Sequence, residues 1–443
     1  MQIDVLLGLQ WGDEGKGKIV DVFTPHYDII ARFQGGPNAG HTLEFQGTKH
    51  VLHHIPSGIF RKDTINLIGN GVIIDPMTFK AETEALEAKG VDTRENLFIS
   101  NKTHLILPTH RLLDLALERS KGNQKIGSTL KGIGPTYTDK VARHGLRTGD
   151  IILSDFHEKY KKLKERHLTL LSTYGLNIED EKIDGISFNE YESKWMDAIE
   201  QFKGMKLIDS ENYINSQLNA GKKVLAEGAQ GTLLDLDFGS YPFVTSSNTI
   251  TAGVCSGLGI APSRINRVYG VFKAYCTRVG SGPFPTELYD DCGQKMRDQG
   301  NEYGSTTGRP RRCGWLDLPA LKYAIMINGV TDLVITKADV FNGFEKVKVC
   351  DQYMLDNNKV DFSTFTLEQN NLECFLEEFE GWKEGTLSFP FDIKYIFNPL
   401  ELAEKDYGYS SIELSKWLYN TKTQTTPANT LGERHKAPIT SFE

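Results

Sequence analysis

The sequence predicts an α/β fold: one large domain, residues 1–443, around a mostly parallel central sheet. Strand-like apolar runs and glycine loops alternate over residues 1–75 and again from residue 223 to about 350, with helical patterns between them. The chain opens on an apolar run, 3–9, that leads straight into the glycine loop GDEGKGK, 12–18. Alternation of this kind favours parallel strands, and ligands then bind in the loops at the strands' carboxyl ends.

The loop GDEGKGK is predicted to bind phosphate. A strand, a glycine loop and a helix, here 18–23, point backbone N–H groups and a helix N-terminus at an anion. Gly12 and Gly17-Lys18 match the Walker A spacing, but Ile19 stands where that motif has a Ser or Thr. A carboxylate inside a phosphate loop is repelled unless a metal or a proton lies between the two charges. We therefore interpret Asp13 as a metal ligand, a general base or both, against the alternative that the loop is only a solvated turn.

The remaining elements follow from local patterns. A helix is expected from Asp75 to Gly90, with Pro76 in its first turn and Gly90 just past its end. A second helix, Arg111 to Gly122, carries Leu112, Leu115 and Ala116 on one face. A charged helical subregion covers about 155–218, and its mixed charges favour a solvated surface over a binding patch. Strands are expected at 28–33, 49–52, 65–68, 97–107, 223–226 and 332–335.

Composition narrows the class of protein. The net charge of −8 disfavours nucleic acid as the main partner, because a phosphate backbone requires a basic face. Six scattered cysteines show no metal-ligand spacing and are predicted to be reduced thiols. The chain shows no signal peptide and no apolar run of about 18 residues, so we expect a cytoplasmic protein without a membrane span.

Four further loops carry polar groups suited to ligands. Loop 35–42 offers bare backbone, an amide and His41, which has little packing role between Gly40 and Thr42. Loops 126–135 and 227–232 likewise combine glycines with polar side chains. A further polar stretch, 245–249, follows soon after the second of them in the chain. Loop 304–312 holds three arginines, which suit a carboxylate or a phosphate better than a chance basic turn.

The last loop, TKAD at 336–339, predicts recognition of guanine. The carboxylate of Asp339 can accept hydrogen bonds from the ring N–H and the exocyclic amine, and the stem of Lys337 can cover the base. Adenine would leave that carboxylate unpaired, at a cost of about 1.5–3 kcal/mol for each lost bond. Combined with GDEGKGK, the motif indicates GTP.

Eight motifs in this order resemble the adenylosuccinate synthetase family over about residues 3–350. They are WGDEGKGK, GGPNAGHT, GIGPTYTDKVAR, EGAQGTLLD, YPFVTSSNT, RVGSGPFPTEL, TTGRPRRCGW and TKADV. The resemblance implies a magnesium-dependent homodimeric ligase with one magnesium ion per site. It implies that GTP, as co-substrate, drives the joining of IMP and L-aspartate into adenylosuccinate through a 6-phosphoryl-IMP intermediate, the first step from IMP to AMP in purine biosynthesis.

The resemblance also implies roles for individual residues. Asp13, His41 and Gln230 are the expected catalytic residues, with Asp13 as base and His41 as acid, and Asp13 and Gly40 are the expected metal ligands. The expected GTP site is Gly12, Asp13, Glu14, Gly15, Lys16, Gly17, Lys18, Gly40, His41, Thr42, Arg311, Lys337, Ala338, Asp339, Thr430, Leu431 and Gly432. The expected IMP site is Asp13, Glu14, Gly15, Lys16, Asn38, Ala39, Gly40, His41, Thr129, Arg143, Gln230, Thr245 and Arg309. The expected aspartate site is Ser305, Thr306, Thr307, Gly308, Arg309, Pro310 and Arg311.

Two departures and one special role complete the expectations. Pro37 replaces the histidine usual in the family, and Asn429 to Arg434 differs from the family's final guanine-site segment, so the register of 430–432 is open. Arg143 follows a loop-to-helix stretch among Lys140, His144 and Arg147, and the resemblance implies that it reaches the nucleotide bound by the other subunit of the dimer.

Two other classes of protein compete with a ligase. A GTP-binding switch needs a DxxG loop; DDCG at 290–293 has the letters but lies late in the chain, and a switch leaves the loops of His41 and Arg309 unexplained. A nucleotide kinase would transfer the γ-phosphate to a product that persists, without any need for an amino acid.

Overall fold

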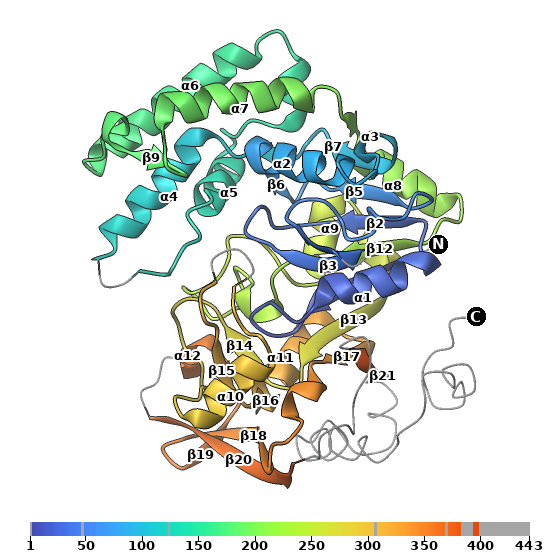
Figure 1. Cartoon of the computed structure of the whole chain (residues 1–443), viewed down its shortest axis with the longest axis vertical. Coiled ribbons are helices and arrows are strands. Elements are labelled where there is room, and N and C mark those ends of the chain that lie inside the picture. Colours follow the sequence, from blue (N-terminus) through green and yellow to red (C-terminus); the bar gives the residue numbers. More distant parts are fainter. Residues whose placement is uncertain are drawn as a thin grey trace. The chain divides into compact units, whose positions relative to one another are not determined.

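The computed structural model describes residues 2–45, 48–122, 125–304, 308–367, 371–381 and 393–397 (Figure 1). The chain divides into two compact units. The N-terminal unit comprises residues 1–5, 16–230 and 242–266, and the C-terminal unit comprises residues 6–15, 231–241 and 267–443. The expectation of a single domain stays a prediction.

The predicted mostly parallel sheet is confirmed. Over the residues that the structure describes, the sheet has nine strands in the order β11-β7-β5-β2-β12-β1-β13-β17-β21. The pairs β11-β7, β7-β5, β5-β2, β2-β12 and β13-β17 are parallel, and β17-β21 is antiparallel. The run of buried apolar residues in β1, β2 and β12 is what a strand covered on both faces requires. In chain order the strands are β1 (Ile3–Gly8), β2 (Ile29–Arg32), β5 (Ile65–Ile68), β7 (Leu97–Ser100), β11 (Lys206–Ile208), β12 (Val224–Glu227), β13 (Ile265–Lys273), β17 (Asp332–Thr336) and β21 (Ile393–Phe397).

The N-terminal unit surrounds its strands with helices. They are α1 (Lys16–Phe23), α2 (Pro76–Glu87), α3 (Thr93–Asn96), α4 (Pro108–Ser120), α5 (Ile133–Ala142), α6 (Phe156–Thr173), α7 (Phe188–Phe202), α8 (Ser210–Asn219) and α9 (Ala252–Leu258). Short strand pairs complete it: β3 (His41–Phe45) with β4 (Thr48–Leu52), β6 (Ile73–Ile74) with β8 (His104–Leu105), and β9 (Lys182–Ile183) with β10 (Ile186–Ser187).

Two predicted boundaries are corrected by the structure. The strand predicted at 97–107 is two strands, β7 and β8, because the backbone turns where Thr103 N–H donates to the carbonyl of Ser100. The second helix begins at Pro108 instead of Arg111, since a proline lacks the N–H that the first turn of a helix leaves unpaired. The helix at 75–90 is confirmed as α2, and the side chain of Asp75 caps it by accepting from Met77 N–H at 3.1 Å.

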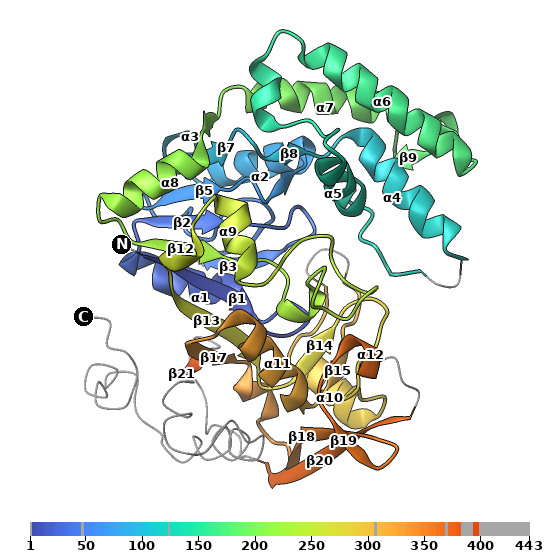
Figure 2. The same ribbon diagram turned by 180° about the vertical axis from the view of Figure 1, so that it is seen from behind.

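The charged subregion is helical as predicted. Helices α6 and α7 run side by side in both views (Figures 1 and 2). Their inner faces bury Leu163 and Trp195, while pairs such as Lys162 with Glu158 lie on exposed turns. The mixed charges are therefore a solvated face and not a basic patch.

The C-terminal unit adds smaller elements around β13 and β17. They are β14 (Cys276–Arg278), α10 (Asp291–Gln299), β15 (Arg312–Gly314), β16 (Leu316–Asp317), α11 (Leu318–Asn328), β18 (Lys346–Leu355), β19 (Asn358–Val360), α12 (Thr364–Leu367) and β20 (Leu372–Glu380). Strand β14 pairs antiparallel with β15, and this pairing fixes the base of the loop before Arg312. Within the described residues, no helix is both long and apolar enough to cross a membrane.

Candidate nucleotide-binding and catalytic residues

The loop after β1 closes on one of its own carboxylates. Gly12 and Gly15 have positive φ angles of 88° and 87°, and Asp13 has a φ of 61°, a left-handed conformation uncommon for a residue with a side chain. Glu14 is fully buried, and its Oε1 accepts from the N–H groups of Gln10 at 3.1 Å and Gly12 at 3.0 Å. Glu14, expected among the ligand-binding residues, thus also shapes the loop, whereas the neighbouring Asp13 is exposed.

Asp13 is joined to a buried network of charges in the C-terminal unit. Its Oδ2 lies 2.8 Å from Nε of Arg311, whose Nη1 donates to Oε2 of Glu302 at 2.6 Å. The other oxygen of Glu302 accepts from Lys273 Nζ at 3.0 Å and from the hydroxyl of Tyr275 at 2.6 Å. Burial alone would raise the pKa of Glu302, but the charges of Lys273 and Arg311 outweigh it and lower the pKa to about 2.

The TKAD loop follows β17, as expected. Lys337 adopts a φ of 60° and its Nζ donates to the carbonyl of Gly300 at 2.8 Å. Oδ1 of Asp339 is buried and has no hydrogen-bond partner among the described residues. A buried carboxylate oxygen without a partner can accept a hydrogen bond from a nucleobase that carries N–H donors.

In the N-terminal unit, His41 is held by a buried carboxylate. Oε1 of Glu227 lies 2.5 Å from Nδ1 of His41 and accepts from Ser57 Oγ at 2.7 Å, and the Nη1 atom of Arg32 lies 4.0 Å from it. Burial and the charge of Arg32 lower the pKa of His41 despite the opposing effect of Glu227. Nδ1 therefore carries the proton that Glu227 accepts, and Nε2 is buried without a hydrogen-bond partner in the described part of the chain.

The loops at 35–42, 227–232 and 245–249 approach one another in the same unit. Asn38 Nδ2 lies 3.5 Å from Thr245 Oγ1, and a Cβ on Gly35 would lie only 3.0 Å from Oε1 of Gln230. Several buried polar atoms of these loops lack hydrogen-bond partners among the described residues: Asn38 Oδ1 and both side-chain polar atoms of Gln230. Buried polar atoms in native proteins are otherwise nearly always paired, so this set indicates a polar ligand.

The other expected residues are distributed as follows. Lys16 is buried at the start of α1, while Lys18, Thr129, Arg143 and Arg309 are exposed. Arg143 is the C-cap of α5 and has a φ of 64°. Ser305, Thr306, Thr307, Thr430, Leu431 and Gly432 lie outside the described residues, so their roles stay predictions.

Sequence reasoning missed three residues that hold expected ones in place. Glu227 lies inside the EGAQGTLLD motif, and the motif gives no sign that it contacts His41, 186 positions away. Lys273 ends β13 and Glu302 precedes the arginine loop; neither has a local pattern of its own. Only the folded chain brings Glu227 to His41 and joins Lys273 and Glu302 to Arg311, the residue that contacts Asp13.

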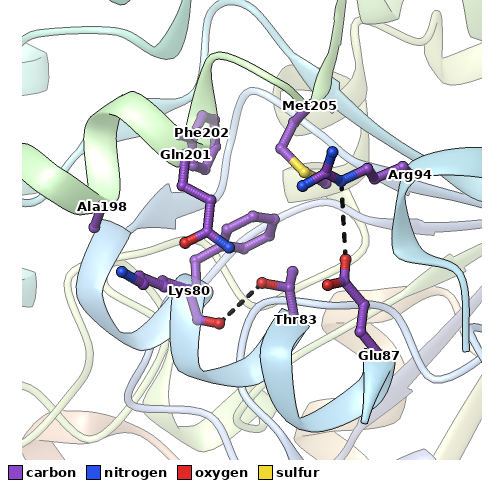
Figure 3. Close-up of a pocket in the computed structure, with 9 residues that line it drawn as sticks. Lys80, Thr83, Glu87, Arg94, Ala198, Gln201, Phe202 and Met205 are labelled. Atoms are coloured by element: carbon purple, nitrogen blue, oxygen red, sulfur yellow. Dashed lines mark hydrogen bonds and ion pairs between the residues drawn. The ribbon is translucent and has the colours of Figure 1, made fainter. Parts of the chain in front are cut away.

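The pocket drawn in Figure 3 does not include any of the expected residues. It is lined by Phe79, Lys80, Thr83, Glu87, Arg94, Ala198, Gln201, Phe202 and Met205. Two polar contacts lie within it: Thr83 Oγ1 donates to the carbonyl of Lys80, and Nε of Arg94 lies 4.0 Å from Oε1 of Glu87. Because the pocket shares no residue with the expected sites, it does not contribute to the candidate site.

Fold and residues together define a class of protein, a nucleotide-binding α/β enzyme with a phosphate loop after its first strand. The family model for adenylosuccinate synthetase matches residues 5–391. The adenylosuccinate synthetases of Flavobacterium johnsoniae and Phocaeicola vulgatus are each 60% identical to this chain, over 404 and 383 residues; these alignments cover 91% and 86% of this chain and 93% and 88% of those proteins.

A solved structure agrees with the sequence matches. The fully ligated adenylosuccinate synthetase from Plasmodium falciparum superposes with a TM-score of 0.77 at 38% identity, covering 87% of this chain and 89% of that one. The chain belongs to the adenylosuccinate synthetase family, and it is a GTP-dependent ligase. The α/β fold and the family resemblance inferred from the sequence are both confirmed.

Proposed function

We propose that this enzyme joins IMP to L-aspartate with cleavage of GTP, giving adenylosuccinate, GDP and phosphate on the way from IMP to AMP. Family membership supports this reaction, and the geometry of the candidate residues is compatible with it. The observation that carries the proposal is that His41 and Asp339 each keep a buried polar atom without a partner in the described chain, while their other contacts hold them in place. Such atoms are available to a ligand.

The proposed chemistry has two steps. The 6-oxo group of IMP is a poor leaving group, so it must first be activated. Asp13 removes the proton from the adjacent ring nitrogen, the 6-oxygen bonds to the γ-phosphorus of GTP, and GDP leaves. The amine of aspartate then bonds to C6 and loses a proton, while the C6–O bond breaks and phosphate departs.

The side chains around Asp13 and His41 suit these roles. Nε of Arg311 lies 2.8 Å from Oδ2 of Asp13 and holds this carboxylate in place. Glu227 fixes the ring of His41 so that Nε2 is the atom left for a phosphate oxygen. The negative charge of a bound phosphate favours the protonated imidazole, so His41 can act there as the acid. Gln230 completes the proposed catalytic set, with both side-chain polar atoms unpaired in the described part of the chain.

Magnesium fits the proposed oxygen donors. A carboxylate, such as the exposed one of Asp13, and a main-chain carbonyl, such as that of Gly40, are hard ligands of the kind this ion prefers. When bound, the ion would neutralise charge on the phosphate oxygens. One ion per site is proposed.

The remaining assignments extend the same proposal. The phosphate loop, loop 40–42, Arg311 and the TKAD loop bind GTP, with 430–432 as a further guanine contact. Asn38, Ala39, Thr129, Gln230, Thr245 and Arg309 bind IMP, and loop 305–311 binds aspartate. A cytoplasmic location is supported by the six cysteines, all of which are free thiols in the structure.

The dimer is part of the proposal because of Arg143. This residue is exposed at the end of α5, and we propose that it contacts the nucleotide bound by the partner subunit. Each active site then combines Asp13 of one chain with Arg143 of the other. A closed two-fold dimer has two such equivalent sites.

Phosphate release from GTP tests the proposal against its two competitors. With IMP present, a ligase releases phosphate stoichiometrically with adenylosuccinate only when aspartate is added. A kinase would accumulate a phosphorylated product without aspartate, and a GTP-binding switch would hydrolyse GTP without regard to IMP or aspartate. Either of those results would reject the proposed reaction.

A further inference from the structure

Three buried side chains meet between helices α4, α5 and α6. Nε2 of His110 and Nε2 of His167 lie 2.9 Å and 2.7 Å from the same oxygen, Oδ2 of Asp139. The two imidazole rings are 4.6 Å apart, and both side chains are almost completely buried. Both views show α5 and α6 beside α4 (Figures 1 and 2). We call these three residues the histidine clasp.

The clasp has the residue types of a metal site, but its hydrogen bonds argue against one. The N–H of Leu107 donates to Nδ1 of His110 at 2.9 Å, so the proton of this neutral ring is on Nε2. A metal at Nε2 would require an imidazolate. Thr109 Oγ1 lies 2.6 Å from Nδ1 of His167, which leaves its Nε2–H to donate to Asp139 in the same way. The clasp is therefore held by two N–H donors on one carboxylate.

Asp139 also fixes the turn that ends α5. Its carbonyl accepts from the N–H groups of His144 at 2.9 Å and Gly145 at 3.2 Å, so Arg143 lies inside a turn closed on Asp139. The left-handed φ of 64° at Arg143 is unfavourable for a residue with a side chain and depends on this closure. Gly145 has no room for a Cβ, which would lie 2.6 Å from the ring of His104.

Through these contacts a single residue links the direction of Arg143 to two other helices. The side chain of Asp139 is bound to α4 and α6, and its main chain carries the turn of Arg143. The clasp uses none of the residues assigned to IMP, GTP or aspartate. A change in the clasp should therefore move Arg143 without touching a ligand.

We propose that Asp139, held by His110 and His167, is a positioning residue for Arg143 and acts on the site of the partner subunit. This inference rests on the proposed function, in which Arg143 serves the partner's nucleotide. Asp139→Asn keeps the shape but weakens both bonds. It should lower kcat/KM for IMP by about 10- to 100-fold, the scale of an ångström-sized displacement, and leave KM for GTP within about threefold.

Subunit mixing separates this role from a merely structural one. Mixed with Asp13→Ala, the Asp139→Asn protein should regain activity to about a quarter of wild type, because half of the dimers contain one intact site. Mixed with Arg143→Leu, it should regain nothing. Tyr160→Phe is the matched control. It removes the hydroxyl by which Tyr160 of α6 donates to Glu192 of α7 at 2.5 Å, and it leaves the three clasp residues unchanged. This variant should leave KM for IMP unchanged.

The outcomes that overturn the inference are distinct from a failure of the proposed function. The inference fails if the Asp139→Asn protein regains activity when it is mixed with Arg143→Leu instead of Asp13→Ala. It also fails if Asp139→Asn leaves kcat/KM for IMP unchanged, because either result would show that Asp139 does not act through Arg143. Failure of the Asp13→Ala and Arg143→Leu pair to complement, despite demonstrated exchange, would instead reject the shared site. If Asp139→Asn does not fold, His167→Phe, which removes one of the two donors, replaces it in both mixtures with the same expected results.

Discussion

The carboxylate of Glu227 lies 2.5 Å from Nδ1 of His41, on a histidine whose other ring nitrogen is buried and without a hydrogen-bond partner in the described chain. Strands β2 and β12 bring Arg32 and Glu227 into register, and Ser57 N–H donates to Oε2 of Glu227 at 2.8 Å. These contacts fix the carboxylate before any ligand arrives. The ring of His41 is consequently oriented by the fold and does not depend on the substrate.

Replacing Glu227 with Gln should lower kcat by about 10²- to 10⁴-fold and change KM for GTP little. The amide still fills the space, but it does not stabilise a protonated His41, and the loss of a positioned general acid falls in this range. Steady-state kinetics with GTP and IMP varied in turn check it. Ser57→Ala removes a neutral donor to the same carboxylate and a long, 3.4 Å contact with Nδ1 of His41, and it should stay within about threefold of wild type. Equal losses in the two variants would contradict the role of Glu227.

Asp339→Asn should weaken the binding of GTP and improve the binding of xanthosine triphosphate, because an amide can donate a hydrogen bond to the 2-oxo group of xanthine. Oδ1 of Asp339, which has no partner among the described residues, motivates this expectation. The loss for GTP should be about 10- to 100-fold in kcat/KM, the value of one hydrogen bond to a charged group. If the preference for GTP over the xanthine nucleotide does not change, another group reads the base.

Glu302→Gln should destabilise the C-terminal unit by about 3–5 kcal/mol, because the buried Lys273 loses its ion pair with Glu302 and Arg311 keeps its contact with Asp13 alone. Denaturant unfolding of the variant measures the loss. The double variant Glu302→Gln with Lys273→Met removes the stranded charge of Lys273 and should recover part of the stability. A double variant less stable than the single one would mean that the charge balance of the network is not what stabilises it.

Acid should destabilise the protein partly through His104. Burial, with Lys140 and Arg147 nearby, lowers the pKa of His104 to about 3. The unfolded chain takes up this proton below about pH 6.5 while the folded chain does not, so stability is full above that pH and is lost as the pH falls toward 3. When the pH is lowered from 7 to 5, the free energy of unfolding of His104→Gln, measured in urea, should therefore fall by about 2 kcal/mol less than that of wild type. Parallel losses in the two proteins would assign the acid sensitivity to other groups.

The elements with local signals are the ones that the sequence predicts well. The apolar runs of β1 and β2, the capped start of α2 and the glycine loop after β1 all depend on neighbouring residues, and the structure places each within a few positions of its expected bounds. Loops 12–18, 35–42, 227–232 and 336–339 follow strands β1, β2, β12 and β17, as expected for ligand loops of a parallel sheet. The other two expectations are wrong, because loop 126–135 follows helix α4 and loop 304–312 follows helix α10.

What the sequence could not predict is the set of side chains that support the site. Glu227 contacts His41 across 186 positions. Glu302 reaches Arg311 because the backbone closes beside it, where Tyr303 and Pro310 form an isolated bridge and Arg311 N–H donates to the carbonyl of Glu302 at 2.9 Å. From the sequence we expect Pro108 to end a strand, but in the structure it begins α4. A proline that follows an extended residue is compatible with the end of a strand and with the start of a helix, so the sequence alone does not distinguish them. Long-range partners of charged residues leave no periodic trace in the chain.

IMP labelled with ¹⁸O at the 6-position tests the central claim most directly. The enzyme is incubated with labelled IMP, GTP and aspartate, and the phosphate released is examined by mass spectrometry. If the 6-oxygen attacks the γ-phosphate and later leaves with it, one ¹⁸O atom appears in the phosphate for each adenylosuccinate formed. Unlabelled phosphate, or phosphate formed without adenylosuccinate, would contradict the proposed ligation through a 6-phosphoryl intermediate.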